Sequence, residues 1–235
     1  MSDFVSRERE LNELEPYSIA SERHLQMMLG NPDFIQAFVS SMRLLGMCFV
    51  YRPVKEGSLG ALESIRSMDV SADWPFGDSK SLMHAAMLIA QGSMEDPREL
   101  DLEFQRLFHG TGTRVAPPFG SVYMDHDQVI NGWTWMALRD WMRSHGINAL
   151  YEENEPEDQF GRMLVLAAEL AYARPDLLGE FLGDHLLPWS GHFLELFQTD
   201  QLPATYRGLA MLTAVSLEDT QQTLGITPAK RKFYR

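Results

Sequence analysis

Cysteine is nearly absent from this chain, since Cys48 is the single one among 235 residues. One cysteine cannot form an internal disulfide, and a metal site would need ligands of other kinds. Cys48 stands inside an apolar run, where a thiol is usually buried and inert. The sequence therefore disfavours a disulfide-stapled fold and gives thiol catalysis little support.

Basic residues are also few. The chain has 20 Lys and Arg against 33 Asp and Glu, which gives a formal net charge of -13. A surface of that sign repels nucleic-acid backbones, and no basic stripe with interleaved aromatic residues offsets it. We expect no nucleic-acid partner. A basic partner is favoured, although an acidic surface also serves solubility alone.

Long apolar runs are missing as well. The segment Met1–Glu10 is charged throughout and has no apolar region of the kind found in signal peptides. No apolar run approaches the roughly 20 residues that span a bilayer. We therefore expect a cytoplasmic protein that is not an integral membrane protein.

The common motifs for nucleotide, metal and acyl chemistry do not occur. Gly110 and Gly112 begin a phosphate-loop pattern that fails at Val115, and no Walker sequence is present. H-E-x-x-H and G-x-S-x-G are absent. His126 lies between two aspartates, but adjacent residues seldom converge on one ion, so a solvated turn is expected. No metal site is predicted.

Helical periodicity dominates the rest of the chain. It predicts helices over residues 33–51, 79–91, 97–108, 133–145, 155–173, 177–187, 190–197 and 204–224. Residues 110–132 form the longest stretch without a helical period, and Val122–Met124 could be extended. A loop of that length is often functional. Without repeats or a linker, we expect one all-α domain over residues 1–235, a helical bundle with a long functional loop.

An acidic segment precedes the predicted helix 155–173. Asn154 and Glu157 resemble a capping pair, and Pro156 fits a first helical turn. Five acids crowd this stretch: Glu152, Glu153, Glu155, Glu157 and Asp158. One or two would suffice for the helix dipole, at about 0.3–1 kcal/mol each. Three interpretations stay open: a grip on a cationic ligand, a cap that also aids solubility, and an acid pair for hydrolysis.

The loop Ala116–Asp125 carries two adjacent prolines before an aromatic residue. Pro117 and Pro118 hold Phe119 in place at low entropic cost, which suits a binding edge. The same geometry would also serve a rigid turn that packs Phe119 into the core.

Three segments carry a resemblance to a known family. They are Phe104–Phe108, Pro117–Tyr123 and Asn154–Gly161, with the basic–aromatic tail Lys230–Arg235 completing the match. Together they resemble the TorD/DmsD family of redox-enzyme maturation chaperones. The resemblance implies an all-helical chaperone, not an enzyme, that binds the twin-arginine leader of a molybdoenzyme of the dimethyl sulfoxide or trimethylamine N-oxide reductase type. It implies no cofactor, apart from the weak GTP binding of some relatives, and it admits contact with the Tat translocase.

From the resemblance and the two segments we predict a set of leader-binding residues. They are Phe104, Leu107, Phe108, Pro118, Phe119, Gly120, Tyr123, Glu155, Glu157, Asp158 and Gln159. Phe104, Leu107, Phe108 and Phe119 would form an apolar groove for the middle of the leader. Glu155, Glu157 and Asp158 would receive its arginines.

The chain departs from the family pattern at three positions. The family usually has Trp at 119, His at 159 and Pro at 111, where this chain has Phe119, Gln159 and Thr111. Gln159 removes a group that titrates near neutral pH but can still form hydrogen bonds.

The rival interpretations are a small-molecule hydrolase that uses the acid cluster near 153–158, and a scaffold with no peptide ligand.

Overall fold

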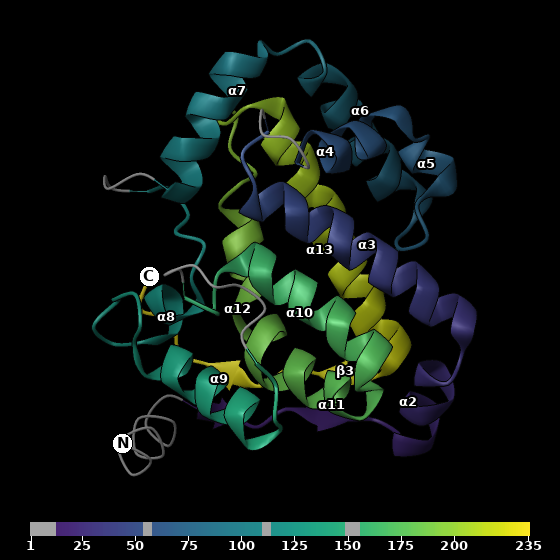
Figure 1. Ribbon diagram of the computed structural model, residues 1–235, viewed down its shortest axis with the longest axis vertical. Coiled ribbons are helices and arrows are strands. Elements are labelled where there is room, and N and C mark those ends of the chain that lie inside the picture. Colours follow the sequence, from purple (N-terminus) through teal and green to yellow (C-terminus); the bar gives the residue numbers. More distant parts are fainter. Residues whose placement is uncertain (1–12, 54–57, 110–113, 149–155) are drawn as a thin grey trace.

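The computed structural model describes residues 13–53, 58–109, 114–148 and 156–235 (Figure 1). These residues form a helical molecule with very short strands. The helices are α2 (Glu22–Leu29), α3 (Pro32–Val50), α4 (Ser58–Ser67), α5 (Val70–Asp73), α6 (Ser79–Gly92), α7 (Pro97–Phe104), α8 (Gly120–Met124), α9 (Trp133–Ser144), α10 (Phe160–Ala173), α11 (Pro175–Glu180), α12 (Leu187–Glu195) and α13 (Ala204–Leu224). Two π-helical turns, η1 (Gln105–His109) and η2 (Phe181–Leu186), extend α7 and join α11 to α12. The all-α prediction is confirmed.

Two antiparallel strand pairs tie the chain ends of the described structure together. β1 (Glu13–Glu15) pairs with β4 (Lys230–Arg231), and β2 (Ser18–Ile19) pairs with β3 (Ile226–Thr227). Neither these strands nor α2 was predicted, because each strand has only two or three residues and is fixed by a partner about 200 residues away.

The core is built on α3, which lies against α10 (Figure 1). Asn31 caps α3 by accepting hydrogen bonds from the N–H groups of Asp33 and Phe34, and Pro32 occupies the first turn. Gly46 of α3 and Gly161 of α10 meet where the helices cross. A Cβ atom added at Gly161 would lie 2.6 Å from the carbonyl oxygen of Gly46. The crossing therefore depends on having no side chain at this point.

A second helix pair, α6 against α13, closes the other half of the core. Here too glycine permits the approach, because a Cβ atom added at Gly208 would lie 2.9 Å from the backbone nitrogen of Ile89. The buried indole N–H of Trp74 donates to the hydroxyl of Ser216 at 2.8 Å, which ties the α5 region to α13. Gly225, with φ of 66°, ends α13 in a left-handed conformation.

Among the described residues, one helix, α3, is long and apolar enough by composition to cross a membrane, with a mean hydropathy of 1.3. The expectation that no segment would reach this threshold was wrong. More than half of the apolar window, 56%, is buried inside the molecule. A central core helix passes the same test as a membrane span, and α3 is packed as a core helix.

Two predicted elements need correction. Val122–Met124 is not extended but lies in the short helix α8, which is too brief to show a period in the sequence. The predicted helix 155–173 begins at Phe160 instead of Glu155, and Gln159 rather than Asn154 is its cap. Pro156 therefore precedes the helix. Residues 149–155, with Glu152, Glu153, Asn154 and Glu155, lie outside the described residues.

Candidate functional site

The proline loop and the acidic segment meet in the structure, as the sequence predicts. Phe119 and Gln159 form an isolated antiparallel bridge. The N–H of Phe160 donates to the carbonyl oxygen of Pro118 at 2.8 Å, and the N–H of Gly120 donates to that of Asp158 at 3.3 Å. These bonds place the start of α8 beside the start of α10 and bring Asp158 into a buried site between them.

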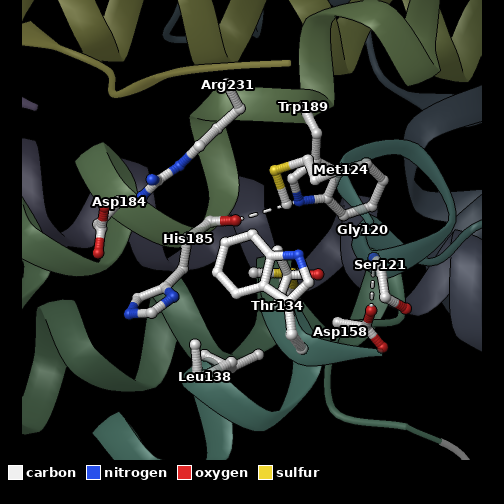
Figure 2. Close-up of a pocket in the computed structure, with 13 residues that line it drawn as sticks. Gly120, Ser121, Met124, Thr134, Leu138, Asp158, Asp184, His185, Trp189 and Arg231 are labelled. Atoms are coloured by element: carbon white, nitrogen blue, oxygen red, sulfur yellow. Dashed lines mark hydrogen bonds and ion pairs between the residues drawn. The ribbon is translucent and has the colours of Figure 1, made fainter. Parts of the chain in front are cut away.

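Asp158 is a buried carboxylate with one free oxygen (Figure 2). Its Oδ2 accepts a hydrogen bond of 2.9 Å from the backbone N–H of Ser121, in the first turn of α8. Its Oδ1 is buried and accepts none from the described part of the chain. Burial raises the pKa of Asp158 to about 6, against the opposing effect of the Ser121 N–H. Asp158 therefore caps α8, not the helix that follows it in sequence.

Asp125 is a second buried carboxylate, at the end of α8. It accepts a 2.7 Å hydrogen bond from the Thr134 hydroxyl and a longer one from the Thr134 N–H, at the start of α9. Burial raises the pKa of Asp125 to about 7, and the charge of Asp158 adds to this rise. The solvated turn expected around His126 is half right, because His126 is exposed and Asp125 is not.

The raised pKa of Asp125 predicts a pH-dependent stability. Between about pH 4 and pH 7 the folded protein holds a proton on Asp125 that the unfolded chain releases, so stability falls as pH rises through this window. Asp125→Asn should remove this loss while keeping an acceptor for Thr134. Relative to wild type, the variant should gain about 3–4 kcal/mol in unfolding free energy between pH 4 and pH 8, since the pKa rise is about three units at roughly 1.4 kcal/mol each. Urea denaturation at both pH values measures it, and a constant difference between the two proteins would contradict the assignment.

A small cavity lies beside Asp158 (Figure 2). It is lined by side chains from α8, α9, η2, α12 and β4, among them Thr134, His185, Trp189 and Arg231. The space open to the centre of a water-sized sphere is ≈ 20 Å³, enough for about one water molecule. The cavity must widen before a group as large as a guanidinium can reach Oδ1.

Glu157, next to Asp158, already holds an arginine of the same chain. Its carboxylate accepts a 2.6 Å hydrogen bond from the indole N–H of Trp135 and lies 3.2 Å from Nε of Arg139. The Arg139 guanidinium lies 4.8 Å from the centre of the Trp135 ring. A carboxylate beside an aromatic face is a good guanidinium site. Trp135 and Arg139 were missed in the sequence, where their i, i+4 spacing on α9 was the available signal.

The predicted apolar groove is not an open surface in this structure. Phe104, Leu107 and Phe108 are core residues, 0–3% exposed. The Phe108 ring packs edge-on against Phe49 of α3 and stacks on Phe197, which follows α12. The three rings fill the space between these helices. The rings were expected on a binding face, and their real place is the interior.

The predicted contact residues of the proline loop and α8 are also buried. Pro118 and Phe119 are covered, with the Arg114 guanidinium 5.8 Å from the centre of the Phe119 ring. A Cβ atom added at Gly120 would lie 2.9 Å from the indole nitrogen of Trp189, so Gly120 permits close packing. Tyr123 stacks on Trp189 with ring centres 5.7 Å apart. These residues pack beneath the site and are not exposed to a ligand.

The side-chain amide of Gln159 has a structural role, which explains why an amide suits this position. Its Nε2 donates to the carbonyl oxygen of Phe49 at 2.9 Å, and its Oε1 accepts from the N–H of Arg162 at 2.8 Å. The side chain thus caps α10 and joins it to the end of α3. Because both ends of the amide are used inside the protein, Gln159 is not presented to a ligand in this conformation.

No group of three or more His, Cys, Asp or Glu side chains that could hold a metal ion occurs within the described ranges. Cys48 is buried in the core, and burial raises the pKa of its thiol to about 12.

Comparison with known proteins identifies the relatives of this chain. Residues 73–195 match the family described as nitrate reductase delta subunit. The chain is 38% identical over 194 residues to the probable Tat proofreading chaperone DmsD of Haemophilus influenzae, covering 82% of this chain and 94% of that protein. It is 35% identical over 199 residues to the Tat proofreading chaperone DmsD of Salmonella typhimurium, covering 84% and 96%. The chaperone protein TorD of Aliivibrio fischeri is 26% identical over 133 residues, covering 51% and 61%.

The helical fold and these relatives define the class of this protein as a chaperone, not an enzyme. The chain belongs to the TorD/DmsD family of redox-enzyme maturation chaperones. Nothing in the comparisons supports the alternative of a small-molecule hydrolase.

Proposed function

We propose that this chain binds the twin-arginine leader of a molybdopterin oxidoreductase of the dimethyl sulfoxide or trimethylamine N-oxide reductase type. It holds the enzyme in the cytoplasm until cofactor insertion is complete, and then releases it to the Tat translocase. The observation that carries the proposal is the pair Glu157 and Asp158, placed beside the start of α8 in a chain similar over most of its length to Tat proofreading chaperones. The proposal needs no cofactor bound to this chain.

The two carboxylates suit the two arginines in different ways. Glu157 is partly exposed at the rim, where a leader arginine can exchange with Arg139 on the Trp135 face. Asp158 lies deeper, with Oδ1 available once the cavity widens. A hydrogen bond to a charged group contributes about 1.5–3 kcal/mol. The contact at Asp158 therefore offsets much of the roughly 2–5 kcal/mol needed to order a flexible leader, and the exchange at Glu157 adds a smaller net gain.

A direct test is calorimetry of the full chain with a synthetic twin-arginine leader and a twin-lysine version. Arginine engages a carboxylate with two parallel N–H donors and stacks on an aromatic ring, and lysine does neither as well. The twin-lysine leader should bind at least about tenfold more weakly. Equal affinity for both leaders would refute the carboxylate grip. A companion pull-down compares the client enzyme with and without its leader, and capture of both alike would refute leader recognition itself.

With the aromatic residues buried in the core, the apolar middle of the leader needs another contact, and the loop after α8 offers one. Val129 and Ile130 are 49% and 43% exposed. They lie between Gln128 and Asn131, whose φ angles of 50° and 67° are left-handed. Residues other than glycine adopt that backbone conformation at a cost in free energy, and such strain often occurs at functional sites. The loop therefore exposes two apolar side chains to solvent, and the left-handed residues on either side of them cost conformational free energy.

Replacing both Val129 and Ile130 by serine should weaken leader binding about three- to tenfold, because each apolar side chain gives up part of its transfer free energy. The unfolding free energy should change little, since both side chains are largely exposed. Calorimetry and urea denaturation measure the two effects. Unchanged affinity would remove this loop from the proposed site. Tyr172→Ser, at an exposed position on α10, is the matched control.

A further inference from the structure

The basic–aromatic segment Lys232–Arg235 continues from β4 and lies against α8 and α12. The N–H of Tyr234 donates to the carbonyl oxygen of Tyr123 at 2.9 Å. Nη2 of Arg235 donates to the carbonyl oxygen of Arg114 at 2.6 Å, and Nε2 of His192 lies 3.0 Å from the carbonyl oxygen of Arg235. In Figure 1 the C label lies beside α8. The segment therefore covers one side of the candidate site.

The side chains of this segment are lightly held. Phe233 is 44% exposed and stacks on His192 with ring centres 5.0 Å apart. Tyr234 is half-buried and meets His126 edge-on at 5.4 Å. Lys232 and Arg235 are exposed. A segment with few buried apolar contacts and exposed hydrogen bonds opens at a low free-energy cost.

The residue just before this segment is firmly anchored. Arg231 is buried, with its guanidinium 2.5 Å from Asp184 and also paired with Glu13 of β1. Lys230 and Arg231 form the strand β4. The change from a buried ion pair to an exposed strip thus occurs between residues 231 and 232, and the strip can move away without disturbing the anchor.

The surface beneath the segment is suited to a peptide. We call it the tail bed and define it by Arg114, Tyr123, His126 and His192. It offers two backbone carbonyl acceptors, on Arg114 and Tyr123, and two imidazole rings. The Tyr123 hydroxyl is buried and has no hydrogen-bond partner among the described residues. An extended peptide with cationic and aromatic side chains can use the carbonyls, the rings and this hydroxyl.

We propose that the tail bed is the docking surface for the part of the client leader next to its twin arginines, which themselves reach Glu157 and Asp158, and that Lys232–Arg235 occupies this bed in the free protein. The proposal rests on the proposed function, because it takes the leader as the partner. The segment combines two cationic and two aromatic side chains, the same mixture of cationic and apolar groups that a twin-arginine leader offers. The leader must displace the segment before it binds.

The test replaces residues 232–235 by Gly-Ser-Gly-Ser in the full chain and measures affinity for a synthetic twin-arginine leader by calorimetry. Removing an internal competitor raises the apparent affinity by the inverse of the open fraction, so we expect leader binding about five- to twentyfold tighter. Tyr234→Pro, which deletes the N–H that bonds to Tyr123, should tighten binding in the same direction by a smaller factor. Tyr172→Ser should leave the affinity unchanged.

Hydrogen exchange gives a second readout in the wild-type chain. The Tyr234 amide should lose protection when the leader binds, because its bond to Tyr123 is broken. Leader binding of equal strength in wild type and both variants, with Tyr234 still protected, overturns the displacement model alone. Absence of leader binding in every form overturns this inference and the proposed function together. The two failures are therefore distinguishable.

Discussion

Gly161→Ala is expected to destabilise this protein by about 3 kcal/mol, the upper end of the cost of overpacking a core. The added Cβ atom would lie 2.6 Å from the Gly46 carbonyl oxygen and 2.8 Å from the side chains of Phe49 and Val50. Its nearest obstacle is backbone, which cannot rotate away as the end of a flexible side chain can. The only relief is to separate α3 from α10, and that separation loosens packing along the whole helix pair.

Gly191→Ala in α12 is the matched control. A Cβ atom there meets nothing within 4 Å. Alanine is preferred over glycine inside a helix, so this variant should be neutral or up to about 1 kcal/mol more stable. Urea denaturation at neutral pH, with the slope compared as well as the midpoint, separates the two variants. Similar unfolding free energies for both would show that the α3–α10 crossing is not as close as described.

The long helices of this fold could be predicted because each carries its own periodic signal. The predicted range 204–224 coincides with α13, and 33–51 differs from α3 by one residue at each end. In both cases the apolar residues recur along a stretch of about 20 residues, so the period is well sampled. The C-terminal glycine of α13 and the proline before the body of α3 mark their boundaries.

The errors at the acidic segment share one physical cause, which is dependence on partners that are distant in the sequence. The acids at 152–158 were interpreted as the start of the following helix, since carboxylates favour helix N-termini. Asp158 does cap a helix, but that helix is α8, which precedes it by more than 30 residues. Gln159 likewise bonds to Phe49, 110 residues earlier. A capping partner that far away in sequence leaves no local pattern.

The candidate site was predicted in its location and not in its surface chemistry. The sequence placed the Pro118–Ser121 loop and Asp158 together, and the bridge between Phe119 and Gln159 does so. It could not tell whether an aromatic side chain faces a ligand or the core, because both environments select the same residue types. Phe104 and Phe108 were predicted to face the leader, and they lie in the core. The guanidinium contact that the structure shows is that of Arg139 with the Trp135 ring.

Asp158→Asn is expected to weaken binding of a twin-arginine leader about 10- to 100-fold, which corresponds to the roughly 1.5–3 kcal/mol of a charge-assisted hydrogen bond. Asparagine keeps the oxygen that accepts from the Ser121 N–H, so the α8 cap should survive. The substitution also removes the cost of burying a charge, so the folded protein should not lose stability at neutral pH. Calorimetry for affinity and urea denaturation for stability test the two parts separately.

Glu157→Gln is the control for this comparison. Glu157 is partly exposed and already engages Trp135 and Arg139, so its loss should cost only a few-fold in affinity. A larger effect at Glu157 than at Asp158 would reverse the proposed order of the two carboxylates and place the main arginine contact at the rim.

Asp158→Asn also tests whether leader binding depends on pH. Burial raises the pKa of Asp158 to about 6, so below that pH most of the free protein carries a neutral acid there. An arginine binds the ionised form, and binding at lower pH must therefore release a proton. Wild-type affinity should rise from pH 5 to pH 7.5, and Asp158→Asn should lose most of that rise, with Asp125 accounting for any remainder. Affinity that is independent of pH in the wild type would mean that the leader arginine does not engage the buried acid, even if the rim contact at Glu157 holds.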